Sequence, residues 1–272
     1  METNKIYQGD CLKLMKEIED KSIDLILCDL PYGTTACKWD TIIPFEPLWE
    51  QYKRIIKDNG AIVLTASQPF TTDLINSNRT WFKYCWIWEK NFVSGFLNAK
   101  KQPLRKYEDI VVFYLKQPKY NPILVKKDKE SIRWNNIEQN GITETYGKIR
   151  AKQKRYEFRD IAIDLKYPSN ILRFSTRHKI HRDIPTEKPV ALFEYLIKTY
   201  TNEGDLVLDN CIGSGTTAIA CIRTNRNFIG MELSPEYCQI ANNRIQKELS
   251  QSKLNNEVGI PPKDLGILPN FI

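Results

Sequence analysis

Apolar residues along the first part of the chain follow two different spacings. Mostly apolar stretches of strand length occupy 22–29, 60–66, 81–90 and 108–115, and such stretches are typical of strands buried on both faces. Residues 44–60 instead place apolar side chains at helical intervals, after an initial proline and before an Asn-Gly stop. Strands that alternate with helices predict an α/β fold, in which helices cover both faces of a parallel sheet.

The same alternation returns after residue 184. Helices are predicted there at 186–201 and 234–249, and strands at 204–210 and 227–233. The segment 214–224 is predicted to open a further helix after a glycine loop. Ser234 and Pro235 mark the start of one helix as its N-cap and first residue. The tail 251–272 contains turn residues, and we expect little helix in it.

The stretch between these two parts, 115–184, has no clear apolar period and is strongly basic. Residues 115–182 contain 17 Lys and Arg against 7 Asp and Glu, a net charge of +10, whereas the rest of the chain has 23 against 26, or −3. A mildly acidic body with one basic segment indicates a polyanionic partner. We therefore divide the chain into 1–114, a basic insertion at 115–184, a second half at 185–250 and the tail 251–272.

Composition disfavours several classes of protein. No apolar run approaches the roughly 20 residues of a membrane helix, and the N-terminus lacks the pattern of a secretory signal. The seven cysteines are scattered without a CxxC pair, which favours reduced thiols in a cytoplasmic protein over disulfides or zinc. His178 and His181 lie in a basic stretch without further ligands at matched spacing, so no metal site is predicted.

The first predicted strand ends in an unusual way. Its last residue, Asp29, is followed directly by Leu30, Pro31, Tyr32 and Gly33. These residues place polar and stacking groups at one edge of the sheet, where a site needs them. We expect a functional site at this edge, although Tyr32 alone also fits a rim aromatic in a turn.

A second polar strand end occurs in LVLDNCIGSGTT, residues 206–217. Asp209 closes the strand, and Gly213 and Gly215 allow tight turns and the close approach of a ligand. The next strand ends on Glu232, where an acid commonly contacts the sugar hydroxyls of a nucleoside. The loop has neither GK[ST] nor a regular GxGxxG, but its context predicts nucleoside binding.

The two strand ends together resemble those of the S-adenosylmethionine-dependent DNA amino-methyltransferases, which methylate the exocyclic amine of adenine or cytosine. DLPY (29–32) is similar to the catalytic motif of this family, although proline is commoner at its second position. IYQGDCLKLMKEI (6–18) and IPTEKP (184–189) are similar to two further family elements. The catalytic motif precedes the cofactor loop, as in the beta arrangement of the family. The resemblance implies a doubly wound, Rossmann-like mixed sheet with permuted motifs and a basic inserted recognition region.

The resemblance also implies roles for individual residues. The catalytic residues would be Asp29, Pro31 and Tyr32. The cofactor S-adenosylmethionine would be bound by Asp10, Cys11, Asp29, Lys188, Asp209, Cys211, Ile212, Gly213, Ser214, Gly215, Thr216, Thr217, Glu232 and Leu233. Double-stranded DNA would be contacted by Tyr32, Gly33, Lys148, Arg150, Lys152, Lys154 and Arg155. Residues 1–114 would then form the catalytic half of one methyltransferase domain, and 185–250 its cofactor-binding half.

Simpler structural roles stay open for several of these residues. Asp10 would also fit the N-cap of the helix that follows it. Asp209 would also fit a partner for a helix dipole, and Lys188 an ordinary lysine in the first turn of a helix. The basic run 147–159 would also fit a solvated surface without a ligand.

The catalytic motif can support chemistry on an aromatic amine, whose lone pair is delocalised into the ring. The Asp29 carboxylate and a backbone carbonyl near Pro31 would accept the two N–H groups and draw the lone pair out of conjugation. The carboxylate would also stabilise positive charge that develops on the nitrogen. The target base would be flipped out of the duplex and stacked on Tyr32. Within the family, an acid in the first position favours adenine.

Other functions stay open beside adenine methylation. The same chemistry would serve the N4 amine of cytosine, whereas methylation of the cytosine ring carbon is disfavoured because no Pro-Cys pair occurs. A non-catalytic DNA-binding protein with a retained fold is a second alternative. A nicotinamide oxidoreductase would leave DLPYG and the basic segment unexplained, and RNA is a further substrate class. The family suggests a homodimer and a cognate restriction endonuclease as partners; a membrane is not expected.

Overall fold

The structure is a computed structural model of the 272-residue chain, and its described residues are 1–33, 40–127, 165–175 and 187–258. Their helices and strands follow the chain in this order: β1 (Lys5–Gln8), α1 (Cys11–Leu14), β2 (Ile23–Asp29), α2 (Phe45–Ile55), β3 (Ile56–Ala66), α3 (Phe70–Ser77), β4 (Phe82–Ser94), β5 (Arg105–Phe113), β6 (Val125–Lys126), β7 (Leu165–Lys166), β8 (Ile171–Arg173), α4 (Val190–Tyr200), β9 (Leu206–Asp209), α5 (Thr216–Arg223), β10 (Asn227–Glu232) and α6 (Pro235–Val258). Short 3-10 turns lie at Met15–Glu17 and Phe96–Asn98.

One mixed sheet organises the larger compact unit, which contains the described residues of 1–121 and 169–263. Its eight strands lie in the order β1-β10-β9-β2-β3-β5-β4-β8. The first five are mutually parallel, β5 is antiparallel to both of its neighbours, and β8 is parallel to β4. The predicted Rossmann-like mixed sheet is confirmed, with β5 reversed among otherwise parallel strands.

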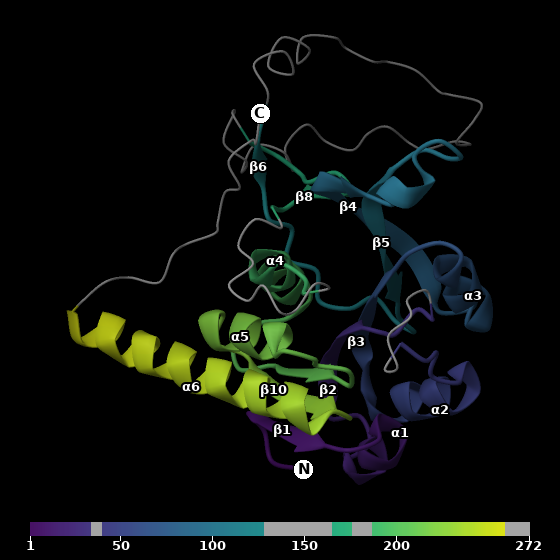
Figure 1. Cartoon of the computed structure of the whole chain (residues 1–272). Helices are drawn as coiled ribbons and strands as arrows, with labels where there is room; N and C mark the ends of the chain where they lie inside the picture. The colour runs from purple at the N-terminus through teal and green to yellow at the C-terminus, as the bar shows by residue number, and fades with distance from the viewer. Residues whose placement is uncertain (34–39, 128–164, 176–186, 259–272) are drawn as a thin grey trace, which may run out of the picture. The chain divides into compact units, whose positions relative to one another are not determined.

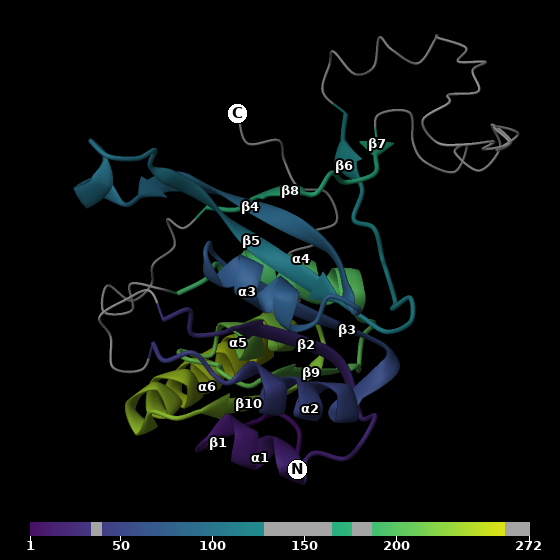
Figure 2. The same ribbon diagram turned by 90° about the vertical axis from the view of Figure 1, so that its right-hand side faces the viewer.

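Helices cover both faces of this sheet (Figure 1). Helices α1, α2 and α3 lie on one face, and α4, α5 and α6 on the other. The strand β2 lies in the middle of the sheet, and its apolar side chains are fully buried, as a continuous apolar run predicts. Helix α2 packs its buried stripe of Leu48, Trp49, Tyr52 and Ile55 against the core. In Figure 2 the long strands β4 and β5 lie side by side, and their connection projects beyond the helices.

The order of the strands creates a crevice beside β2. From β2 the chain continues through α2 to β3 on one side, whereas from β9 it continues through α5 to β10 on the other. Where two neighbouring parallel strands lead in opposite directions, their carboxyl ends leave room for a ligand. Asp29 ends β2 and Asp209 ends β9, so both predicted strand ends lie at this point.

Two element boundaries differ from those predicted. Helix α2 ends at Ile55 and β3 already begins at Ile56, so the Asn-Gly pair lies within the strand. Little helix was expected in the tail, whereas α6 continues into it as far as Val258. No proline or glycine interrupts residues 251–258, and the helix meets its first breaker only at Gly259.

The second compact unit, 122–168 with 264–272, is described only in part. Its described residues form a small antiparallel pair between β6 and β7. Lys148, Arg150, Lys152, Lys154 and Arg155 lie outside the described residues, and so do both histidines. The boundaries of the basic insertion stay a prediction.

Candidate active site

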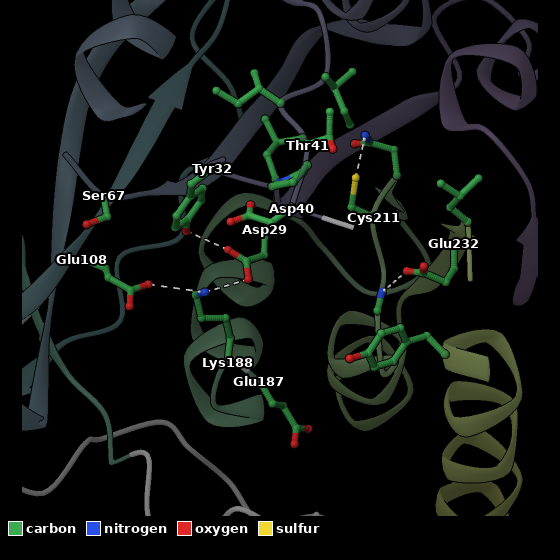
Figure 3. Close-up of a pocket in the computed structure, with 18 of the residues that line it drawn as sticks. Asp29, Tyr32, Asp40, Thr41, Ser67, Glu108, Glu187, Lys188, Cys211 and Glu232 are labelled. Carbon is green, nitrogen blue, oxygen red and sulfur yellow. Dashed lines mark hydrogen bonds and ion pairs between the residues drawn. The ribbon is translucent and has the colours of Figure 1, made fainter. Parts of the chain in front are cut away.

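A pocket of about 780 Å³ opens at the carboxyl ends of the parallel strands. Its walls bring together the loops that follow β1, β2, β9 and β10, segments that lie far apart in the sequence (Figure 3). The strands β4 and β5 supply a further wall, to which β5 contributes Arg105, Tyr107 and Glu108. A volume of this size suits a nucleoside-sized ligand.

Asp29 is the centre of a hydrogen-bond network in this pocket. Its Oδ1 accepts from the Tyr32 hydroxyl at 2.7 Å and from the hydroxyl of Thr65, which lies opposite Asp29 in the adjacent strand β3. Its Oδ2 accepts from Lys188 Nζ at 2.7 Å. The carboxylate is thus fixed from two sides before any substrate arrives, which is the preorganisation that a reacting charge needs.

Tyr32 is held between a second aromatic ring and the carboxylate. Its ring stacks on Phe70 with 5.2 Å between centroids, and Lys188 Nζ lies 5.6 Å from its centroid. Burial, reinforced by the charges of Asp29 and Glu108, raises the pKa of Tyr32 well above its usual range. The phenol therefore keeps its proton and donates a hydrogen bond to Asp29.

Lys188 lies between two carboxylates (Figure 3). Its Nζ is 2.7 Å from Asp29 Oδ2 and 3.4 Å from Glu108 Oε2, and Lys90 pairs with the other oxygen of Glu108 at 3.0 Å. Burial alone would lower the pKa of Lys188, but the two carboxylates outweigh it and the pKa is raised. Lys188 is therefore a charged partner of Asp29, and its predicted contact with the cofactor stays a prediction.

The glycine loop follows β9 and turns directly into α5. Gly215 has φ +90°, and a Cβ there would lie 2.9 Å from the Cβ of Ala241 in α6, so only glycine fits without strain. The Gly213 N–H donates to Glu232 Oε2 at 2.9 Å, and the Ser234 N–H donates to Oε1 at 2.8 Å. Glu232 thus ties the glycine loop to the end of β10.

Asp209 lies beneath this loop and is only 3% exposed. Its oxygens accept from the Cys211 N–H at 3.1 Å and from the Thr217 hydroxyl. Burial raises the pKa of Asp209 from 3.8 to about 7, against the opposing effect of these hydrogen bonds. Its contacts shape the loop, and Asp209 is absent from the residues that line the pocket.

The raised pKa of Asp209 predicts a loss of stability as the pH rises. Between its unfolded pKa of 3.8 and its folded pKa of about 7, the folded state binds the extra proton, so the free energy of unfolding falls through this window. The full effect is roughly 4 kcal/mol. Urea unfolding at pH 5 and pH 8 should show a smaller difference for Asp209→Asn than for wild type, and equal differences would contradict this assignment.

The pocket offers groups that fit the nucleoside part of S-adenosylmethionine. Asp10 lines it while its Oδ1 accepts from the Leu12 N–H at 2.8 Å, so Asp10 also has the predicted role of an N-cap. Glu232 presents a carboxylate at the end of β10, suited to sugar hydroxyls. Leu233 lines the same wall with 68% of its side chain exposed, an apolar surface that a planar base can cover.

The predicted site residues fall into three groups. Those that line the pocket are Asp10, Cys11, Asp29, Pro31, Tyr32, Lys188, Cys211, Gly213, Glu232 and Leu233. Those that lie behind the lining or beside it are Gly33, Asp209, Ile212, Ser214, Gly215, Thr216 and Thr217. The basic DNA-contact residues of 148–155 lie outside the described residues.

Sequence reasoning missed Thr65, Glu108 and Lys90. Thr65 could have been found as a polar residue at the end of the predicted strand 60–66, next to Asp29 in a parallel sheet. Glu108 lies at the amino end of its predicted strand, and the rule that sites form at the carboxyl ends of parallel strands does not lead to it. It reaches the site because β5 runs antiparallel to β3.

The described part of the chain offers neither a metal site nor a membrane span. Within it, no group of three His, Cys, Asp or Glu side chains is arranged to hold a metal ion. None of the helices described there is both long and apolar enough to cross a bilayer.

Comparison with known proteins identifies the family. The sequence model of the N6/N4 DNA methylases matches residues 23–243, which include both strand ends and the glycine loop. The chain belongs to this family of S-adenosylmethionine-dependent DNA amino-methyltransferases. The family resemblance seen in the sequence is confirmed, as is the use of S-adenosylmethionine as the methyl donor.

Two curated relatives of this methyltransferase show the extent of the likeness. Type II methyltransferase M.HpaI of Haemophilus parainfluenzae is 28% identical over 262 residues, which cover 90% of this chain and 75% of the relative. DNA adenine methyltransferase YhdJ of Escherichia coli (strain K12) is 29% identical over 264 residues, which cover 90% and 83%. Both matches span nearly the whole chain.

Two solved structures share the fold. M1.HpyAVI in complex with S-adenosylmethionine superposes with a TM-score of 0.60 at 24% identity, covering 89% of this chain and 98% of that one. The cytosine-N4-specific PvuII DNA methyltransferase superposes with a TM-score of 0.62 at 16% identity, covering 98% and 95%. The mixed sheet with helices on both faces is therefore common to these DNA methyltransferases.

Proposed function

We propose that this DNA methyltransferase transfers a methyl group to the N6 amine of a flipped-out adenine in double-stranded DNA. The observation that carries the proposal is the placement of Asp29 in the same pocket as Glu232 and the glycine loop. A carboxylate that can accept an N–H group of the target amine thus lies in the same cavity as groups suited to bind a nucleoside. Asp29, Pro31 and Tyr32 are the proposed catalytic residues.

Asp29 acts as an acceptor and as a fixed negative charge. Its carboxylate accepts one N–H of the amine, and the backbone carbonyl near Pro31 accepts the other. As the nitrogen attacks, positive charge develops on it beside the carboxylate, which stabilises the transition state. The methylated amine is acidic and loses its proton readily, so a strong base is not required. The protonated hydroxyl of Tyr32 keeps Oδ1 in place, while its ring lines the pocket as a stacking surface.

The cofactor supplies an activated methyl group on a sulfonium centre. Glu232, Asp10 and Leu233 are the residues proposed to hold its nucleoside. Gly213 and Gly215 keep the loop backbone close to the ligand, since both have positive φ values. The task of these residues is to bind and orient, because an in-line transfer depends on alignment of donor and acceptor.

The choice of adenine rests on the acid at the start of the catalytic motif. Family members with Asp in this position lean toward adenine, and those with serine toward cytosine. The relative YhdJ is named as an adenine methyltransferase, whereas PvuII methyltransferase is named as specific for cytosine N4. Methylation of cytosine N4 is the second candidate, since the same pocket chemistry would serve it.

Nucleoside analysis tests the proposed reaction. Purified wild type is incubated with methyl-labelled S-adenosylmethionine and unmethylated duplex DNA, and the digested nucleosides are resolved by mass. We expect label in N6-methyl-2′-deoxyadenosine. Label in N4-methyl-2′-deoxycytidine would keep the mechanism and change the base, whereas an absence of label from DNA would contradict the proposal. An RNA duplex of the same sequence, tested in parallel, identifies an RNA substrate.

Aromatic and basic side chains at the mouth of the pocket support a nucleic-acid substrate. Phe92 and Tyr107 are 53% and 50% exposed and line the pocket from β4 and β5. The exposed Arg105 lines the same wall. Such a combination suits a strand whose bases stack and whose phosphates are negatively charged.

The basic insertion is expected to supply DNA affinity that depends on salt. Replacing Lys148, Lys152 and Lys154 by Gln should weaken binding and lower the slope of log Kobs against log salt by close to three, at about 0.9 per phosphate contact. Titrations of labelled duplex between roughly 50 and 200 mM salt measure this slope. The matched control replaces the exposed Lys13, Lys16 and Lys247 by Gln; an equal loss there would show a general charge effect instead.

Two further features of the proposal concern assembly and place of action. The protein is proposed to act in the cytoplasm, on DNA that a cognate restriction endonuclease would otherwise cut. A homodimer is the expected assembly. The homodimer and the endonuclease are expected from the family resemblance, and the cytoplasm from the scattered cysteines.

A further inference from the structure

Three ionisable side chains from separate parts of the fold meet at the centre of the pocket. Asp29 comes from the end of β2, Glu108 from β5, and Lys188 from the turn before α4. Lys188 is 9% exposed, against 29% for Asp29 and 17% for Glu108. A lysine so nearly buried is costly unless its charge is paired. Its location between the two carboxylates removes that cost.

The two carboxylates hold Lys188 in different ways. Asp29 Oδ2 accepts a hydrogen bond from Nζ at 2.7 Å. Glu108 Oε2, at 3.4 Å, is buried and makes no hydrogen bond among the described residues, so charge alone attracts it to Lys188. Of the two carboxylates, only Asp29 thus accepts a hydrogen bond from Lys188, whereas Glu108 contributes its negative charge.

We propose that Lys188 is the positioning residue for the Asp29 carboxylate, and that Glu108 preserves the negative charge which Lys188 alone would cancel. This inference rests on the proposed function of Asp29. Asp29 and Lys188 by themselves form a neutral pair, which offers little to a nitrogen that gains positive charge. Glu108 shares the charge of Lys188, so Lys188 neutralises Asp29 only in part and the carboxylate keeps its effect on a positive transition state.

Lys90 limits the repulsion within this cluster. It binds Glu108 Oε1 on the side away from Lys188 at 3.0 Å and is 13% exposed. With Lys90 the four groups carry no net charge, and Asp29 forms the negative end of the row. The four groups alternate in sign from Lys90 to Asp29, so each buried charge has an opposite charge as its neighbour.

A positioning role and a cofactor-binding role for Lys188 predict different effects of the same substitution. If Lys188 fixes Asp29, Lys188→Met lowers kcat by roughly 10- to 100-fold, the loss expected for one charged hydrogen bond. The dissociation constant of S-adenosylmethionine should then stay near that of wild type. If Lys188 binds the cofactor carboxylate instead, the dissociation constant rises and kcat at saturating cofactor persists.

A double-mutant cycle tests the part assigned to Glu108. Glu108→Gln removes the charge at constant volume and leaves Asp29 neutralised by Lys188, so kcat should fall by roughly 10-fold. The variant with both Lys188→Met and Glu108→Gln carries the Asp29 charge alone. Its kcat should exceed the value expected if the two losses simply multiplied. One change removes a positive charge and the other a negative charge, so the second change restores the net charge that the first one altered.

A second bridging lysine provides the matched control. Lys119 Nζ lies 2.6 Å from Asp205 and 3.5 Å from Asp24, at the amino ends of β9 and β2, opposite the pocket. Lys119→Met removes a cation that likewise bridges two carboxylates, although Lys119 is 31% exposed against 9% for Lys188, and it should leave kcat unchanged. It therefore separates an effect on Asp29 from a general loss of stability.

The experiment measures kcat by labelled methyl transfer and cofactor affinity by calorimetry for wild type and all four variants. Low kcat with retained affinity, together with coupling between Lys188 and Glu108, supports the proposal. Weakened cofactor binding with retained kcat, or losses that simply multiply, would overturn it. If Lys188→Met does not fold, an undiminished kcat in Glu108→Gln overturns it equally. An inactive wild type would instead refute the function of the site as a whole.

Discussion

Asp29→Ala is expected to lower kcat for methyl transfer by roughly 10³-fold, the upper range for losing one preorganised group that stabilises a transition-state charge. The variant should still fold, because each partner of Asp29 has a second partner. Tyr32 keeps its hydrogen bond to Thr65 at 2.9 Å, and Lys188 keeps its ion pair with Glu108. Affinity for S-adenosylmethionine should change little, since no residue of the glycine loop is altered.

Initial rates of labelled methyl transfer at saturating cofactor and DNA measure this loss. Asp73→Ala is the matched control, because Asp73 is an exposed acid in the first turn of α3 and lies outside the pocket lining. It should behave as wild type. A kcat for Asp29→Ala within about tenfold of wild type would show that the carboxylate has no essential part in the reaction.

Glu232→Ala is expected to weaken binding of S-adenosylmethionine by roughly 100-fold, or about 2.7 kcal/mol. The change removes the carboxylate offered to the sugar and also the acceptor for two backbone N–H groups, those of Gly213 and Ser234. Hydrogen bonds to a charged group contribute about 1.5–3 kcal/mol each. The kcat at saturating cofactor should be affected far less, because Asp29 keeps its contacts.

Calorimetric titration with S-adenosylmethionine measures the predicted loss of affinity. Glu236→Ala is a suitable control, since Glu236 lies four residues further on, in the first turn of α6, and is exposed. It removes the same charge from nearly the same place. An unchanged dissociation constant in Glu232→Ala, or an equal loss in both variants, would contradict the role of Glu232.

Both strand ends that carry the site could be predicted from the sequence. Asp29 and Asp209 each follow an uninterrupted apolar run, and the carboxyl ends of parallel strands meet at one edge of a sheet. Glu232 followed from its place at the end of the next strand after the glycine loop. These inferences required only the pattern of strands and the position of acids within it.

The direction of a strand could not be predicted from its apolar run. An apolar run shows that a strand is buried, but the same run fits either orientation. The structure turns β5 antiparallel to β3, and this orientation brings Glu108 to Asp29. For the same reason, the pairing of Lys188 with both carboxylates was not foreseen, since 159 residues separate Lys188 from Asp29.

The pairing of Lys188 explains how an acid can remain a good acceptor in a partly enclosed pocket. A carboxylate with no partner would be costly to bury, and one neutralised by a single lysine would lose its effect on a cationic transition state. Two carboxylates that share one lysine meet both demands. The positioning of Asp29 thus depends on residues from β2, β5 and the start of α4, which only the folded sheet brings together.

A crystal structure of wild type with S-adenosylhomocysteine is the most direct test of a methyl-transfer site at Asp29. We predict that the nucleoside lies against Glu232 and Leu233, and that the sulfur faces the Asp29 carboxylate across the pocket. A ligand bound elsewhere, or one whose sulfur faces away from Asp29, would contradict the assignment of this pocket as the active site.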